Sequence, residues 1–440
     1  MTPVNAAAVT VETSIPDHVA PNRPAAIFTY GSAPGRPDVT LGGEPVAITS
    51  TARAADGRAR WWGVLRVPGL APGQQAAVSA GDASLLSITA GTTVPTAAGA
   101  PSGRRVAICM TTYEPAEALF RAQIESIRAQ SHDDWHCVIV DDCSGDDAQA
   151  MIERVVEGDE RFTVHRMERR LGFYGNFERA LTLVPADAQR IALSDHDDRW
   201  HPDKLAVLEQ ALAGRSLAYS DMRLVAEDGS VHRETLWKGR HNNHTDLTSM
   251  LIANTITGAA AMLRRDLLDI ALPFPGPLGV MFHDHWLACC ALATGEVSYV
   301  DRPLYDYVQH PGAVFGEVSS GRRLRRPAAA TRAAYFYGYL GRVLYAATLL
   351  DRGGRRIAEA DRTRLERFVC AERSAACLAE LAARGTRHRF GTSATLGSES
   401  ELVAGILWRH RAVAGAARDL SLPDPLAAQQ RRLRRWRAAL

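Results

Sequence analysis

The chain has 440 residues, 46% of them hydrophobic and 23% charged, which is the composition of a globular protein with about two or three domains. Its net charge of +2 hides an asymmetry. Residues 321–440 carry 24 arginines against 10 acidic residues, whereas the preceding residues carry 27 basic and 39 acidic residues. Seven cysteines, two of them adjacent, exclude a disulfide framework and favour a reducing compartment. Without a hydrophobic leader or an apolar run of about 18 residues, we expect a cytoplasmic protein that is peripheral to a membrane at most.

Residues 1–95 contain short runs rich in Val, Ile, Thr and Trp, with Pro and Gly between them. Strand-length runs with turn signals about every ten residues predict a β-sandwich of the fibronectin or immunoglobulin type. Trp61 and Trp62 are adjacent in one such run. Because strand side chains alternate in direction, we expect one in the core and the other facing solvent, where it might stack on a sugar. Residues 96–103 have the composition of a flexible linker.

From residue 104 onward, predicted strands and helices alternate. The strands are Val106–Met110, His136–Val140, Phe162–Arg166 and Arg190–Leu193, and the helices are Pro115–Gln130 and Phe173–Leu183. This alternation predicts an α/β domain with a mostly parallel, Rossmann-like sheet over residues 104–318. In such sheets ligands bind beyond the carboxyl ends of the strands.

Polar residues follow three of these strands, in the segments TTYE, DDCS and SDHDD. The last contains Asp195, Asp197 and Asp198, whose mutual repulsion a cation would offset, and carboxylate oxygens suit Mg²⁺ or Mn²⁺. The alternative is a solvated acidic turn that caps the helix begun by Pro202. A nucleotide diphosphate with its metal explains all three segments together. The G-x-G-x-x-G and P-loop motifs are both absent, which disfavours dinucleotide and P-loop sites.

Seven short segments follow one another in this part of the chain: CMTTYEP, IVDDCSGDD, RRLGFYGNFERAL, LSDHDDRWHPDKL, NTITGAAAMLRR, FHDHWLA and YVQHPGAVFG. In this order they resemble glycosyltransferase family 2, the inverting enzymes with the GT-A fold, over residues 104–318. The segment with Trp200 and Lys204 is most similar to the rhamnosyltransferase-like bacterial branch. The resemblance implies a nucleotide-diphosphate sugar as donor and Mn²⁺ or Mg²⁺ as cofactor. Glu114 and His196 depart from it, since relatives often have Asn and Gln there.

The resemblance also implies roles for individual residues. Asp142 would read the base, Asp195 would lie near the ribose or the metal, and Asp197 would be the main metal ligand, with His310 completing the metal shell. Residues assigned to donor binding are Thr111, Thr112, Tyr113, Glu114, Asp142, Gly172, Asn176, Ser194, Asp195, His196 and Lys204. For His310 the alternative is a polar loop residue. Lys204 is one of only two lysines, with Lys238, and the alternative for both is a solvated helix face.

Asp284 in FHDHW stands where the family places the acceptor base. A sugar hydroxyl needs a carboxylate within hydrogen-bond reach to take its proton as it attacks. The alternative is a cluster that caps a helix start. Joint zinc ligation by His283 and His285 is disfavoured, because residues i and i+2 of a helix project in different directions. Trp286 is expected to pack its own helix, with acceptor stacking as the alternative.

Residues 319–440 read as a basic, all-helical region with helices over Ala328–Leu350, Asp361–Arg384 and Glu399–Leu420. The final RRLRRWRAAL is either a contact for anionic lipid or an Arg-rich helix packed on the acidic body. Nucleic-acid binding is disfavoured because the basic tail lacks a recognised reading motif.

Together these features favour an inverting glycosyltransferase. We expect transfer from dTDP-rhamnose first, or from UDP-galactose or galactofuranose, to a glycan or lipid-linked acceptor in bacterial polysaccharide synthesis. A nucleotidyltransferase and a non-catalytic carbohydrate-binding scaffold are the alternatives. The sequence leaves the oligomeric state open.

Overall fold

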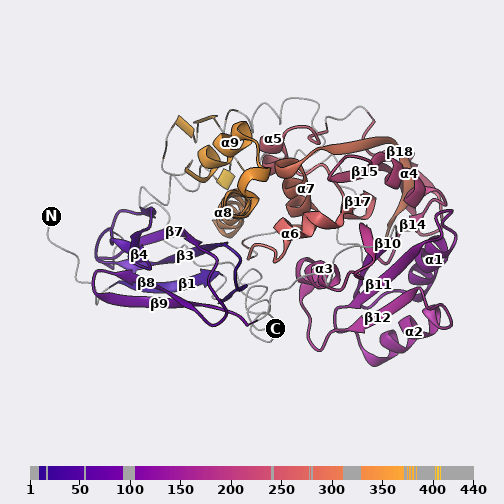
Figure 1. Cartoon of the computed structure of the whole chain (residues 1–440), viewed down its shortest axis with the longest axis horizontal. Helices are drawn as coiled ribbons and strands as arrows, with labels where there is room; N and C mark the ends of the chain where they lie inside the picture. The colour runs from indigo at the N-terminus through magenta and orange to yellow at the C-terminus, as the bar shows by residue number, and fades with distance from the viewer. Residues whose placement is uncertain are drawn as a thin grey trace.

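The computed structural model describes residues 9–15, 18–53, 56–92, 105–238, 242–276, 278, 281–310 and 329–370, with individual residues between 374 and 407. The predicted linker, the residues after His310 in YVQHPGAVFG, and the basic C-terminal stretch lie outside the described residues. Most of the third C-terminal helix lies outside them as well. Figure 1 shows a β-sandwich at one end of the molecule, a large α/β sheet at the other, and α8 between them.

Two sheets with mostly antiparallel pairing form the N-terminal β-sandwich, as predicted. The first, in spatial order, contains β1 (Thr10–Ile15), β3 (Ala25–Ala33), β7 (Ala59–Val67) and β6 (Ile48–Ser50). The second contains β2 (His18–Val19), β9 (Ala83–Ala90), β8 (Gln75–Ala80), β4 (Val39–Leu41) and β5 (Glu44–Pro45).

The expectation that one of Trp61 and Trp62 faces solvent is wrong. Trp61 lies in the core of the sandwich and is 0% exposed. Trp62 points out of the sandwich but is only 1% exposed, because its ring packs edge-on against Phe336 of α8 at 5.5 Å. Neither indole offers a surface on which a sugar can stack.

A nine-stranded sheet organises the rest of the molecule, and the predicted α/β fold class is confirmed (Figure 1). Six of its strands run in one direction: β12 (Phe162–Arg166), β11 (Trp135–Asp141), β10 (Arg105–Thr112), β13 (Ala188–Ser194), β15 (Leu217–Ala226) and β18 (Val297–Gln309). Three run in the opposite direction: β17 (Ala261–Arg264), between β13 and β15, and the short β14 (Arg199–Trp200) and β16 (Val231–Arg233).

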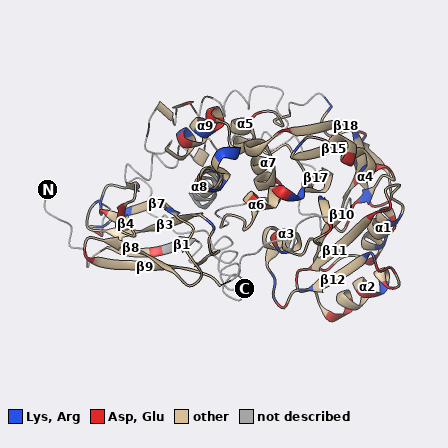
Figure 2. Cartoon of the chain, in the orientation of Figure 1, with Lys and Arg blue, Asp and Glu red and all other residues tan. Residues whose placement is uncertain are grey.

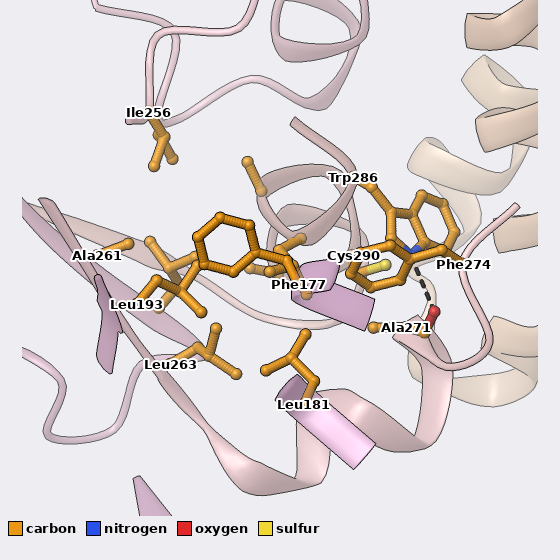
Figure 3. Close-up of a cluster of buried hydrophobic side chains, with 14 of the residues drawn as sticks. Phe177, Leu181, Leu193, Ile256, Ala261, Leu263, Ala271, Phe274, Trp286 and Cys290 are labelled. Atoms are coloured by element: carbon orange, nitrogen blue, oxygen red, sulfur yellow. Dashed lines mark hydrogen bonds between the residues drawn. The ribbon is translucent and has the colours of Figure 1, made fainter. Parts of the chain in front are cut away.

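Helices cover this sheet and connect its strands. They are α1 (Glu117–Arg128), α2 (Asp146–Val156), α3 (Gly172–Thr182), α4 (Lys204–Ala211), α5 (Leu247–Ile252), α6 (Leu268–Ala271) and α7 (His283–Thr294), with 3-10 turns η2 (Gly258–Ala260) and η3 (Arg265–Leu267). Figure 3 shows side chains of α3, α7, β13 and β17 meeting in one buried cluster. Trp286 of α7 is part of it, with its Nε1 donating to the Ala271 carbonyl at 2.9 Å. Its complete burial rules out the acceptor-stacking alternative.

The helical C-terminal region begins with α8 (Ala329–Gly353), followed by η4 (Gly354–Arg356) and α9 (Glu359–Cys370). Tyr345 of α8 packs on Trp286 at 5.0 Å, and Tyr337 packs edge-on against Phe28 of the sandwich at 6.0 Å. Acidic and basic residues alternate along α9 (Figure 2). None of the described helices has the length and apolar character needed to cross a membrane. None of the seven cysteines forms a disulfide in the structure.

Candidate active site

The strand register brings the three predicted polar segments to one edge of the sheet. Thr112 of β10 lies opposite Asp141 of β11, and Met110 of β10 lies opposite Ser194 of β13. Two residues beyond these ends, Glu114 at φ 45° and Cys143 at φ 67°, adopt the left-handed conformation. Strained backbone of this kind concentrates at functional sites. The Glu114 carboxylate accepts from the Gly145 amide at 2.7 Å, so it ties two strand-end loops together.

Asp142 lies at the end of β11 and faces the start of α3. Its carboxylate accepts hydrogen bonds from the backbone amides of Leu171 and Gly172, the latter at 2.8 Å. Burial raises the pKa of Asp142 to about 6, against these two hydrogen bonds, which lower it. Each carboxylate oxygen has a further lone pair, so the group can still accept from a ligand.

Arg170 is a residue that the sequence analysis missed. Its guanidinium lies 3.6 Å from the ring centroid of Tyr113, and its Nε lies 3.8 Å from the Asp142 carboxylate. Tyr113 is 36% exposed, and Arg170 lies over one face of its ring. The only sequence signal was the pair of arginines that precedes Leu171 in RRLG.

Several residues that were predicted to bind the donor are buried near this edge and form hydrogen bonds with neighbouring elements. Asn176 is buried and donates to the Val140 carbonyl at 2.8 Å. Ser194 is buried, and the Gln123 side chain donates to its hydroxyl at 2.8 Å. Nδ1 of His196 lies 3.3 Å from the Thr111 carbonyl, and burial lowers the pKa of His196. Thr111 and Thr112 are also buried.

The predicted metal ligands come together only in part. Nε2 of His310 lies 2.8 Å from Oδ2 of Asp197. Burial raises the pKa of Asp195, as do the nearby charges of Asp197 and Asp284. Within the described part of the chain, no three His, Cys, Asp or Glu side chains are arranged as a metal site. Since Mg²⁺ usually takes one or two carboxylates plus substrate phosphates, Asp197 with His310 still fits a cation shared with a diphosphate.

Asp198, which belongs to this acidic segment, is buried, and so is Lys204. The ammonium of Lys204 donates to the Ala259 carbonyl and lies over the rings of Trp200 and Tyr305, at 3.8 Å and 4.5 Å from their centroids. The expectation of a solvated Lys204 is therefore wrong, whereas Lys238 is exposed as expected. Burial lowers the pKa of Lys204, while the charges of Asp198 and Asp195 raise it.

Asp284 lies in the first turn of α7. Its Oδ1 accepts from the side-chain amide of Asn254 at 3.0 Å, and its Oδ2 accepts from the Gly258 amide at 3.1 Å. Burial raises the pKa of Asp284 to about 6. Its charge acts on Asp195, so the acidic segment and α7 meet at one site. Asn254 is a second residue that we missed, because its sequence neighbours give no sign of the contact.

The two histidines beside Asp284 have separate environments. The ring of His283 stacks on Phe177 of α3, with 3.6 Å between the centroids, and neither of its nitrogens has a hydrogen-bond partner among the described residues. His285 instead bonds the Met250 carbonyl through Nε2 at 2.7 Å. Burial lowers the pKa of each to about 3. The rings do not converge, in line with the prediction against joint zinc ligation.

Residues 107–270 match the model of glycosyl transferase family 2. They form a family 2 glycosyltransferase domain. The match to this family covers the strand ends that carry Asp142 and Asp197, and also Lys204 and the loop from Asn254 to Gly258. It ends before Asp284 and His310, so the family 2 match alone does not assign a role to either of them.

Two named relatives each match a part of the chain. The chain is 34% identical over 109 residues to the putative teichuronic acid biosynthesis glycosyltransferase TuaG of Bacillus subtilis, covering 24% of this chain and 42% of TuaG. It is 32% identical over 126 residues to the succinoglycan biosynthesis protein ExoO of Rhizobium meliloti, covering 28% of this chain and 35% of ExoO. The chain thus matches less than half the length of each of these relatives.

Among solved structures, the chain is similar to S. aureus TarS 1-349 in complex with UDP-GlcNAc. The TM-score is 0.46 and the sequence identity 16%, over 76% of this chain and 90% of that one.

Proposed function

We propose that this protein is an inverting glycosyltransferase. It transfers a sugar from a nucleotide-diphosphate donor to a hydroxyl of a glycan or lipid-linked acceptor in bacterial polysaccharide synthesis. The observation that carries the proposal is the Asp284 carboxylate, which accepts from the Asn254 side chain and from the Gly258 and His285 amides beside the acidic segment of a family 2 domain. The printed names of TuaG and ExoO, which concern teichuronic acid and succinoglycan, support polysaccharide synthesis as the setting.

Asp284 acts as the base. With a pKa of about 6 it is ionised at neutral pH, yet basic enough to take the proton of an attacking hydroxyl. The Gly258 amide and the Asn254 side chain fix its two oxygens, so the carboxylate need not reorient during the reaction. One base on the face opposite the leaving group gives a single displacement, which inverts the anomeric centre.

The donor lies along the edge from Asp142 to Asp197. Tyr113 and Arg170 contact the nucleoside from one side, and Asp142 accepts from the base. Asp195, Asp197 and His310 hold Mn²⁺ or Mg²⁺, which when bound supplies positive charge beside the diphosphate. For the donor we put dTDP-rhamnose first, and UDP-galactose or UDP-galactofuranose second.

The carbohydrate-binding scaffold loses its support, because the two indoles that would have stacked on a sugar are buried. A nucleotidyltransferase is disfavoured by the first strand-end segment, TTYEP, which lacks the Gly-rich, basic character of such enzymes. Membrane contact through residues 431–440 stays a prediction. Liposome co-sedimentation with and without these residues tests it, and equal binding by both forms would contradict it.

A panel of nucleotide sugars tests the proposal. Each is added with Mn²⁺, and both the thermal unfolding midpoint and the release of nucleotide diphosphate are measured. We expect one donor to raise the midpoint and to release its diphosphate slowly even without an acceptor. A protein that binds none of the panel, or that releases triphosphate when pyrophosphate is added, would contradict the proposal.

A further inference from the structure

Lys204 is the first residue of α4, and its ammonium is enclosed by protein. The side chain is 0% exposed, lies over the rings of Trp200 and Tyr305, and donates to the Ala259 carbonyl. Taking an ammonium out of water is costly unless charges and hydrogen-bond acceptors replace the water. The acceptor here is a backbone carbonyl, and the opposing charges that act on the ammonium belong to Asp198 and Asp195.

The Ala259 carbonyl connects Lys204 to the base. Ala259 is the middle residue of the turn η2, which leads directly into β17. The residue before it, Gly258, donates its amide hydrogen to Oδ2 of Asp284 at 3.1 Å. Gly258 is also confined from the other side, because a Cβ on it would lie 2.5 Å from Nε2 of His283. A shift of η2 would therefore move the hydrogen-bond donor of Asp284.

We propose that Lys204 is a positioning residue that couples the acidic segment, residues 194–198, to Asp284 through η2. Its charge holds Asp195 and Asp198 together against their repulsion, and its hydrogen bond to Ala259 sets the position of the Gly258 amide. The catalytic consequence rests on the proposed glycosyltransferase function. Lys204 itself does not contact the donor, which revises its predicted role in donor binding.

The position of Lys204 explains why a lysine stands there. A methionine of similar length would fill the space between Trp200 and Tyr305 but would leave the Ala259 carbonyl without its donor. It would also leave Asp195 and Asp198 without their counter-charge. An arginine keeps both the charge and a donor, although its planar guanidinium is larger than the ammonium. The chain supplies a matched control in Lys238, its only other lysine, which is exposed.

The experiment compares Lys204→Met, Lys204→Arg and Lys238→Met in the full chain. Hydrogen exchange of the peptide covering residues 254–262 reports on η2 without any substrate. Steady-state transfer with the donor identified from the panel gives kcat and KM. We expect Lys204→Met to exchange faster in this peptide and to lose about 100-fold in kcat, since small misplacements of catalytic groups cost that much. Its donor KM should change less than kcat, because Lys204 lies away from Asp142, although Asp195 belongs to the proposed metal site.

Lys204→Arg is expected to recover most of the exchange protection and of kcat, and Lys238→Met is expected to match wild type. Lys204→Met could also fold with a lower unfolding midpoint but with the hydrogen exchange and kcat of wild type. That result would mean that Lys204 only stabilises the core, and it would overturn the proposal. If Lys204→Met does not fold, Lys204→Gln and Lys204→Arg carry the same measurements. Failure of all three to fold also overturns it, in favour of a purely structural role. If wild type uses no nucleotide sugar, the proposed function fails, while the exchange data still decide the role of Lys204.

Discussion

The two halves of the central sheet build their parts of the site in different ways. In the parallel half, from β12 to β13, the polar residues follow directly after their strands, and the backbone amides of Leu171 and Gly172, also about 30 residues away in sequence, hold Asp142. In the other half, Asp284 lies on a helix, and the loop from Asn254 to Gly258 holds it across about 30 residues of sequence. The first half presents groups to the donor, and the second positions a base. Changes in the first should therefore act on donor KM and changes in the second on kcat.

Asp284→Asn should have the largest effect. Asparagine keeps the size of the side chain and can still accept a hydrogen bond, but it cannot take a proton from the acceptor. Because general-base catalysis contributes about 100- to 10,000-fold, we expect kcat to fall by about that factor. Donor affinity, measured by calorimetry with Mn²⁺, should stay unchanged. Near-normal transfer by this variant would mean that Asp284 is not the base, and the second half of the sheet would then have no assigned role in the reaction.

Gly258→Ala should come next. The new Cβ would lie 2.5 Å from Nε2 of His283, and that ring cannot move easily because it stacks on Phe177. The amide that holds Asp284 must shift instead, and we expect kcat to fall about 100-fold. Gly91→Ala is the matched control, since its Cβ would meet nothing closer than 3.8 Å.

A second substitution sharpens this prediction. If contact with His283 causes the loss, the double variant Gly258→Ala with His283→Ala should recover part of kcat, because the smaller side chain makes room. A double variant that is no better than Gly258→Ala alone would mean that the clash is not the cause.

Asn254→Ala tests the half of the site that positions Asp284, through the pH dependence of the rate. Burial raises the pKa of Asp284, the backbone amides of His285 and Gly258 lower it, and the side-chain amide of Asn254, which donates to the same carboxylate, lowers it by a smaller amount. Without it the pKa rises above about 6, and the base stays protonated to a higher pH. A lost hydrogen bond to a charged group shifts a pKa by up to about one unit, so the rate near pH 6 should fall by up to about fivefold while the rate at pH 8 changes little.

The measurement is the acid limb of kcat/KM against pH for wild type and for Asn254→Ala. A limb displaced to higher pH in the variant agrees with the prediction. A uniform loss of rate at every pH would instead assign Asn254 a role in shaping the loop.

The difference between the two halves of the sheet also explains which parts of the structure could be predicted from the sequence. The strand Phe162–Arg166 was predicted with its observed bounds, and the other three predicted parallel strands were found within a few residues, because buried β-rich runs are a local signal. Asp142, Tyr113 and the acidic segment follow these strands directly, so their common edge could be predicted as well. The antiparallel β17 carries no such signal, since it is short and its direction depends on its neighbours.

The contacts of the other half could not be predicted, because they join segments that are far apart in sequence. Lys204 was expected in solvent, yet the rings of Trp200 and Tyr305 and the Ala259 carbonyl enclose it, and two of these three lie more than 50 residues away. Trp62 shows the same limit. Strand alternation predicted that one of the two indoles would leave the core of the sandwich, without saying which, and only α8, which follows more than 260 residues later, buries the outer face on which Trp62 lies.

Arg170→Ala should have the smallest effect, and it tests the donor half directly. Arg170 lies over Tyr113 and near Asp142 but contacts neither Asp284 nor its loop in any hydrogen bond or ring contact of the described residues. Losing one partly exposed cationic contact costs about 1 kcal/mol, so we expect donor KM to rise about five- to tenfold with kcat nearly unchanged. The neighbouring exposed Arg169 provides the control, because Arg169→Ala removes the same charge from the same loop. If Arg170→Ala lowered kcat and left donor KM alone, the two halves would not divide binding from chemistry, and the assignment of the Asp142 edge to the nucleoside would have to be abandoned.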